Sequence, residues 1–192
     1  MIYEKIKERR TIRKYLDKDV PREILIKCVD AARLSPSAAN LQPLKYVIVD
    51  DKKLLKEVFS TLRWAGYLPE EYKPKEKDMP RAYIVILLDK NIRQTPGHDA
   101  GIAAMSISLV AHDEGLGSCI LGNIDREKLR EILNIPDHLD IVLVVSLGYP
   151  AEKPVVDKLR DNDIRYWVDE NGVLHVPKRD LESIVIWNKY QS

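Results

Sequence analysis

The sequence lacks any apolar run near the eighteen or more residues of a membrane-spanning helix. It has only two cysteines, Cys28 and Cys119, which stand far apart with no pairing or metal-binding spacing. Such thiols are typical of a reducing compartment. No secretory signal pattern is visible at the N-terminus. We therefore expect a cytoplasmic protein with no membrane contact.

Neither sign of charge dominates. The 31 basic residues are balanced by 30 acidic ones, which leaves a net charge of +1. No overall field therefore favours nucleic acid or an anionic membrane surface. With 192 residues, of which 45% are hydrophobic and 32% charged, the chain is expected to fold as one domain with a substantial core.

The usual constellations of catalytic side chains are missing. No Ser/His/Asp or Cys/His arrangement is visible, so no side chain is predicted to act as a nucleophile. No metal site is predicted either, because each histidine stands without matching ligands. The four are His98, His112, His138 and His175. A Gly-x-Gly-x-x-Gly pattern after a first strand, the usual dinucleotide fingerprint, is also absent.

One basic stretch stands out in this neutral chain. It runs Arg9-Arg10-Thr11-Ile12-Arg13-Lys14-Tyr15, directly after a short helical pattern. Arginine presents a planar fork of donors that matches phosphate oxygens, and Thr11 adds a hydroxyl. The cluster would suit a compact dianion such as a terminal phosphate. A solvated basic helix end is the alternative, since basic residues favour the C-terminal helix dipole.

A second stretch, residues 35–43, consists of small and polar residues around two prolines. Small residues let a ligand approach the backbone closely, and Asn40 and Gln42 supply both donors and acceptors. An amide-and-carbonyl heterocycle would be recognised well by such groups. An ordinary solvated connection remains the alternative.

Periodicity predicts the remaining elements. Helices are expected over 21–35, 53–59, 99–114, 125–133 and 180–189, and strands over 46–49, 83–88, 118–123 and 141–147. Asn171-Gly172 between two short apolar segments predicts a hairpin. The small residues of the 99–114 helix favour either a central core helix or a dimer seam. Residues 60–81 lack periodicity, and their aromatic residues could cover a flat ligand or pack the loop to the body.

In this order, the pieces resemble the nitroreductase-like family of flavoproteins. Residues 9–15 match an Arg-Arg-Ser-x-Arg-x-Phe-like pattern, with Thr11 in place of serine. Residues 35–43 match Ala-Pro-Ser-x-x-Asn-x-Gln-Pro-Trp, with Leu44 where an aromatic residue is common. The family's central helix and its Gly-Leu-Gly-Ser-Cys-x-x-Gly strand match residues 99–122. Its Leu-Gly-Tyr-Pro motif and following basic pair match 147–150 with Lys158 and Arg160, so the resemblance covers residues 1–160.

The resemblance implies a single FMN-binding domain over residues 1–192. Alternating helices and strands would by themselves suggest a doubly wound parallel sheet. The family instead has an α+β sandwich, with a mixed, mainly antiparallel sheet flanked by helices in an intertwined homodimer. Residues 161–192 would form a C-terminal hairpin and helix extension.

FMN would be bound non-covalently at the dimer interface. The resemblance assigns its phosphate and nearby polar edge to Arg9, Arg10, Thr11, Arg13, Lys158 and Arg160. It assigns the isoalloxazine to Pro36, Ser37, Ala38, Asn40 and Gln42, contributed by the other subunit. A backbone N–H near Leu121 and Gly122 would face flavin N5. One of the arginines of residues 9–13 could instead lie beside N1 and the C2 carbonyl of the flavin.

The implied activity is that of an FMN-dependent oxidoreductase. NAD(P)H would give hydride to flavin N5, and a small conjugated acceptor such as a nitroaromatic or quinone would then take it, in a ping-pong sequence. The cofactor would carry the chemistry and the protein would orient it. Two alternatives stay open: another flavin reaction on this fold, such as reductive dehalogenation or flavin cleavage, and non-catalytic flavin binding or storage.

Overall fold

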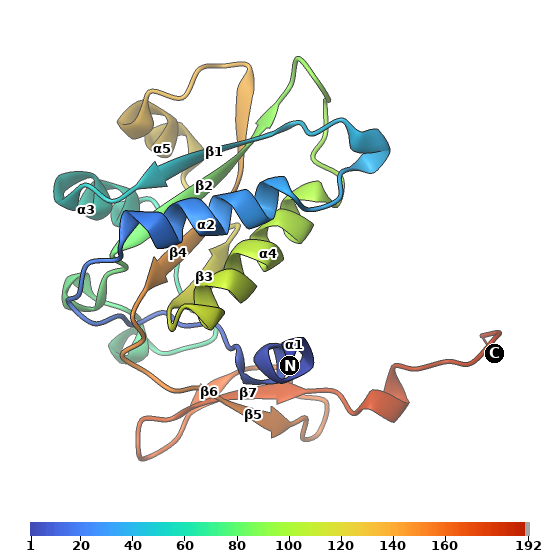
Figure 1. The fold of residues 1–192 in the computed structure, drawn as a ribbon. Coiled ribbons are helices and arrows are strands. Elements are labelled where there is room, and N and C mark those ends of the chain that lie inside the picture. Colours follow the sequence, from blue (N-terminus) through green and yellow to red (C-terminus); the bar gives the residue numbers. More distant parts are fainter. Residues whose placement is uncertain (191–192) are drawn as a thin grey trace.

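In a computed structural model, which describes residues 1–190, the chain folds around a four-stranded antiparallel sheet (Figure 1). The strand order is β1-β2-β4-β3, and each neighbouring pair is antiparallel. The strands are β1 (Leu44–Val49), β2 (Ala82–Asp89), β3 (Gly117–Leu121) and β4 (Leu139–Gly148). The expected mainly antiparallel α+β architecture is therefore confirmed.

Strand β2 explains why helices cover both faces of this sheet. Its apolar run is buried throughout, and successive side chains of a strand point to opposite faces. Tyr83, Val85 and Leu87 accordingly belong to one core cluster, whereas Ile84 and Ile86 belong to the other. A strand with two apolar faces is stable only when a layer of helices covers each of them.

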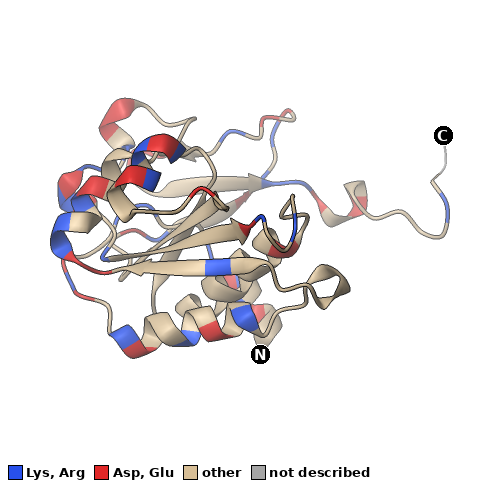
Figure 2. Ribbon diagram, turned by 90° about the horizontal axis from the view of Figure 1, so that it is seen from above, with Lys and Arg blue, Asp and Glu red and all other residues tan. Residues whose placement is uncertain are grey.

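The helices supply those two layers. On one face lie α2 (Arg22–Arg33) and α4 (Asp99–Asp113), and on the other lie α3 (Lys52–Ser60) and α5 (Arg126–Leu133) (Figure 1). Alanines at positions 100, 103, 104 and 111 of α4 are buried, so α4 is a core helix, one of the two alternatives for this segment. Figure 2 shows charges of both signs spread over the helices and loops, while most of the sheet carries none.

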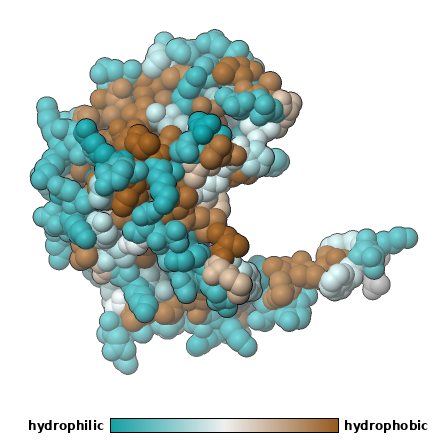
Figure 3. Space-filling model, viewed as in Figure 1, coloured by the Kyte–Doolittle hydropathy of each residue, from teal (hydrophilic) through white to brown (hydrophobic). Residues whose placement is uncertain are grey.

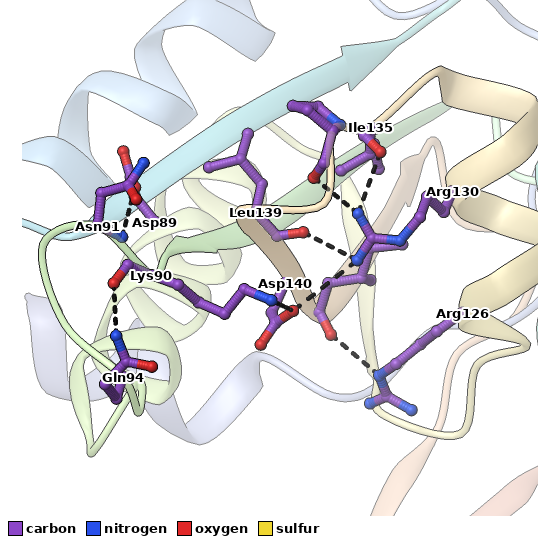
Figure 4. A network of polar contacts seen from close by, with 11 residues as sticks. Asp89, Lys90, Asn91, Gln94, Arg126, Arg130, Ile135, Leu139 and Asp140 are labelled. Atoms are coloured by element: carbon purple, nitrogen blue, oxygen red, sulfur yellow. Dashed lines mark hydrogen bonds and ion pairs between the residues drawn. The ribbon is translucent and has the colours of Figure 1, made fainter.

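Local sequence signals fix the helix ends. Asp125 caps α5 as predicted, because its side chain accepts a hydrogen bond from the Lys128 amide at 3.2 Å. Arg130, in the last turn of α5, donates to the carbonyls of Leu139, Ile135 and Pro136 at 2.7–3.0 Å (Figure 4). These bonds tie α5 to the start of β4, at the opposite end of that strand from the basic stretch.

The C-terminal part forms a second, three-stranded sheet, at the same end of the molecule as α1 (Ile2–Glu8) (Figure 1). Its strands are β5 (Val155–Lys158), β6 (Trp167–Val168) and β7 (Leu174–Lys178), in the order β5-β7-β6. The antiparallel pairing of β6 with β7 confirms the predicted hairpin, and Gly172 in its turn has a φ of +78°. The parallel pairing of β5 with β7 was not predicted.

The predicted C-terminal helix over 180–189 is wrong. Only Leu181–Ser183 forms a helical turn, and the chain then continues as an extended arm away from the body (Figure 1). An isolated helix of this length is marginal in water, and the β-branched run Ile184-Val185-Ile186 lowers its helix propensity further. The arm exposes apolar side chains (Figure 3), among them Trp187, which is 83% exposed.

Candidate functional site

The basic stretch runs beside the sheet in an extended conformation rather than continuing α1. The Ile12 amide donates to the Ser118 carbonyl at 2.9 Å, which places the stretch against the start of β3. The Tyr15 ring is buried, and its hydroxyl donates to the Ile12 carbonyl at 2.6 Å and shares a hydrogen bond with Ser146 Oγ. Burial raises the pKa of Tyr15 well above its ordinary value. Ile12 and Tyr15 are therefore the anchors of the stretch.

Two glycines allow the basic stretch to lie this close to β3 and β4. A Cβ atom at Gly117 would lie 2.6 Å from Ile12 Cγ1, and one at Gly148 would lie 2.8 Å from Tyr15 Cδ1. Such distances are too short for van der Waals contact, so any side chain at either position would push the basic stretch away from β3 and β4.

A carboxylate from the C-terminal segment holds the backbone of the stretch. Glu152 Oε1 accepts hydrogen bonds from the amides of Arg13, at 2.5 Å, and Lys14, at 3.2 Å. Nothing in the sequence around Glu152 signals this role, and sequence reasoning missed it. The bonds fix the direction in which the Arg13 side chain leaves the backbone.

The two neighbouring arginines, Arg9 and Arg10, behave differently. Arg10 donates to the carbonyls of Ile6 and Lys7 at the end of α1, as the solvated helix-end alternative describes. Arg9 pairs with no carboxylate of residues 1–190, and its buried Nε has no hydrogen-bond partner there. Burial lowers the pKa of Arg9, because a cation loses hydration there. Arg9 is half-buried, and burial of its unpaired Nε is costly unless an anion meets the guanidinium.

Arg9 and Arg10 line a cavity of about 450 Å³. Its wall also includes Ser118 and Lys153, together with the carboxylates of Glu8 and Glu152. Glu152 is already engaged by backbone amides. The volume and the unpaired Arg9 therefore fit an anionic group of a ligand.

Arg13 also pairs with no carboxylate within the described part of the chain. Its guanidinium carbon lies 4.7 Å from the centroid of the Tyr166 ring. The side chain is half-buried, and the aromatic contact leaves its positive charge unneutralised.

The loop over 35–43 is held in place by hydrogen bonds, so it is more than an ordinary solvated connection. The buried carboxylate of Asp99, at the start of α4, accepts from Ser37 Oγ at 2.6 Å and from the Ala38 amide at 3.3 Å. The Ser37 hydrogen bond is the main cause that lowers the pKa of Asp99. Ser37 Oγ in turn accepts from the Gln42 amide at 2.9 Å. The Asp99 carboxylate thus shapes the loop, although it lies outside the 35–43 motif.

The loop backbone adopts sparsely populated conformations. Ala39, Asn40 and Gln42 have φ angles of 52°, 54° and 51°, in the left-handed region that disfavours residues with a Cβ. Such strain persists where surrounding contacts over-determine it, and it clusters at ligand sites. Of the residues assigned to the flavin ring, Pro36, Ala38, Asn40 and Gln42 are exposed and Ser37 is half-buried.

The other predicted site residues lie elsewhere on the chain. Lys158 and Arg160 line a separate cavity of about 290 Å³ near the C-terminal sheet, where Arg160 lies 3.7 Å from Asp157 Oδ2. Leu121 is buried at the end of β3, and the Gly122 carbonyl accepts from Arg126 at 3.1 Å. A single chain does not bring these residues to Arg9, so their meeting in one FMN site across two subunits stays a prediction.

The loop over 60–81 divides into two parts. Trp64 is buried and stacks on Phe59, with ring centroids 5.4 Å apart, so this end packs to the body. Tyr67 is 52% exposed, and its ring lies 5.1 Å from that of Tyr166. The loop therefore reaches the aromatic side chain on which Arg13 rests.

Fold and site together define an α+β sandwich with a basic cavity and a strained, carboxylate-held loop. Comparison with models of protein families identifies the family: the model described as "Nitroreductase family" matches residues 6–149. The chain belongs to the nitroreductase family. The resemblance inferred from the sequence motifs is therefore confirmed, and with it the expected class of enzyme, an oxidoreductase.

Two archaeal relatives are similar over most of the chain, and both bear the name "Putative NADH dehydrogenase/NAD(P)H nitroreductase". The protein of Methanothermobacter thermautotrophicus is 37% identical and covers 84% of each chain. That of Archaeoglobus fulgidus is 35% identical over 76% of this chain and 83% of its own.

Solved structures share the fold. An FMN-dependent nitroreductase from Clostridium difficile is 29% identical, with a TM-score of 0.69, over 97% of this chain and 98% of its own. The NADPH:FMN oxidoreductase of Vibrio harveyi, solved with NAD+, has a TM-score of 0.71 over 100% of this chain and 78% of its own. At 20% identity the latter supports the fold alone.

Proposed function

We propose that this protein is an FMN-dependent oxidoreductase that uses NAD(P)H to reduce a small conjugated acceptor, such as a nitroaromatic or a quinone. The observation that carries the proposal is that two arginines of the basic stretch, Arg9 and Arg13, have neither a carboxylate nor a carbonyl partner for their side chains among residues 1–190, in a member of the nitroreductase family. FMN is the cofactor, and when bound it supplies the capacity to accept and donate hydride.

The chain's own residues would bind and orient the cofactor. Arg9, which lines the cavity, would bind the FMN phosphate. Arg13 would donate hydrogen bonds from its free N–H groups either to the phosphate or to the polar edge of the flavin ring. The loop held by Asp99 would present the amides of Asn40 and Gln42 to the flavin ring of the other subunit. Lys158, Arg160 and the backbone near Gly122 would complete the site across the same interface.

The remaining reactive side chains support a reaction carried by the cofactor. Burial raises the pKa of Cys28 to about 12 and that of Cys119 to about 11, so neither offers a thiolate nucleophile at neutral pH. Both cysteines are unpaired, which favours a reducing compartment such as the cytoplasm. No helix of residues 1–190 is long and apolar enough to cross a membrane.

We further propose a homodimer. The arm after Ser183 extends from the body with its apolar side chains in solvent, and α1 exposes Ile2, Tyr3 and Ile6. Exposed apolar patches of this kind mark interfaces. A dimer would cover them and would place the strained loop of one chain near the basic stretch of the other.

The cofactor assignment predicts a yellow protein that releases FMN rather than FAD on heating. The cavity at Arg9, whose Nε has no partner among residues 1–190, suits one terminal phosphate. Chromatography of the released cofactor against standards measures this.

Anaerobic NADH or NADPH should bleach the flavin, and a quinone or nitroaromatic should restore its colour. Rapid turnover with NAD(P)H would exclude a storage protein, and product analysis would separate the other flavin reactions on this fold.

Steady-state kinetics provide a separate prediction. If NAD(P)H and the acceptor use one face of the flavin in turn, they cannot be bound together. Double-reciprocal plots for NAD(P)H at several acceptor concentrations should therefore be parallel, the ping-pong pattern. Intersecting lines would mean that both ligands bind at once, and would rule out the shared-face arrangement.

A further inference from the structure

Tyr166 is the side chain through which the C-terminal segment reaches the basic stretch. It lies just before β6, is half-buried, and its ring faces the Arg13 guanidinium, with 4.7 Å from Cζ to the ring centroid. The Arg13 backbone is already fixed by Glu152. The C-terminal segment thus holds Arg13 at both its amide and its guanidinium.

An aromatic ring holds a guanidinium in a way that a carboxylate does not. A carboxylate would occupy two N–H donors at the edge of the guanidinium and neutralise its charge. A ring at this distance attracts the cation through its π face and takes up none of the N–H donors. Because Arg13 has no carboxylate partner within residues 1–190, its donors and its charge stay available to a ligand.

A second aromatic contact steadies the ring. Tyr67, from the loop over 60–81, lies 5.1 Å from Tyr166 with the ring planes inclined at 58°. Tilted aromatic pairs at such distances are favourable beyond the area that they bury. Tyr67 therefore contacts the Tyr166 ring, and the Tyr166 ring in turn contacts Arg13.

We infer that Tyr166 is a positioning residue, which holds the Arg13 guanidinium with its N–H donors free for an electronegative atom of FMN. The inference rests on the proposed function, because it takes Arg13 to contact FMN. It assigns part of the cofactor affinity to a residue of the C-terminal extension, outside the segment that matches the family model. Tyr67 acts indirectly, through the orientation of the Tyr166 ring.

The test is a double-mutant cycle on the FMN dissociation constant, measured by titration of the apoprotein. Removing a cation–π contact with Tyr166→Leu should weaken FMN binding by about 2- to 30-fold. Tyr166→Phe keeps the ring and should bind within about twofold of the parent. In an Arg13→Ala background, Tyr166→Leu should add no further loss, because the two residues act as one unit. Tyr72→Leu, in the loop over 60–81 that carries Tyr67, makes the same substitution at another tyrosine and should leave binding unchanged.

Different outcomes separate this inference from the proposed function. Additive effects of Tyr166→Leu and Arg13→Ala, or equal losses for Tyr166→Phe and Tyr166→Leu, would overturn the positioning role while FMN binding itself stands. An unchanged dissociation constant in Tyr166→Leu would do the same. A wild-type protein that binds no FMN would instead overturn the proposed function, and the inference with it.

Discussion

Replacing Arg13 by alanine is expected to weaken FMN binding by about 10- to 150-fold while the chain stays folded. A hydrogen bond to a charged group is worth about 1.5–3 kcal/mol, and the substitution would remove it together with the positive charge. The fold should survive because Ile12 and Tyr15, rather than the Arg13 side chain, anchor the stretch. Titration of the apoprotein with FMN measures the change, with circular dichroism as the check on folding.

Two variants sharpen this experiment. Arg13→Lys keeps the charge but loses the planar fork, and should fall between the wild type and alanine. Arg22→Ala removes an arginine that is exposed on α2 and paired with Asp50, and should leave FMN binding unchanged. If Arg13→Ala also leaves the dissociation constant unchanged, Arg13 is a solvated surface residue rather than a ligand of FMN.

Truncation after Ser183 is expected to dissociate the homodimer. Four consecutive apolar side chains, 184–187, would be lost from each arm. Burying one such side chain is worth about 1.5–3 kcal/mol, so the four would contribute about 6 kcal/mol at the lower figure. Even half of that would weaken association by about 150-fold. Light scattering over a dilution series measures the change, and FMN should be lost with the dimer if two chains build its site.

A shorter truncation serves as the control. Removal of Gln191 and Ser192 alone leaves the apolar part of the arm intact and should leave the dimer unchanged. A full-length protein that is monomeric at micromolar concentration and still holds FMN would refute both the assembly and the two-subunit site.

The layered fold was predictable because its signals are local. The apolar run of β2 and the capping aspartate of α5 act through near neighbours in the sequence. The predicted C-terminal helix was wrong because its helical apolar spacing is also only a local signal, and no surface among residues 1–190 covers its apolar side chains. The parallel pairing of β5 with β7 was missed because Val155–Lys158 is too short to carry a strand pattern.

The site was predictable only as far as its sequence motifs reach. The motifs identified the family and singled out Arg9 and Arg13, whose guanidinium groups have no carboxylate partner among residues 1–190. They could not identify the residues that hold those motifs in place. Glu152, Asp99 and Tyr166 each act across the fold, and nothing in the surrounding sequence distinguishes them from surface residues.

The order of the chain has a consequence for how the protein is made. The basic stretch is translated before Ser118, Glu152 and Tyr166, the residues on which it rests. Contacts between distant parts of a sequence form slowly, and these cannot form before most of the chain exists. The basic stretch of a nascent chain therefore lacks these contacts until residue 166 has been translated. If FMN binds as proposed, we expect its complete site to form only after residue 166 has been translated.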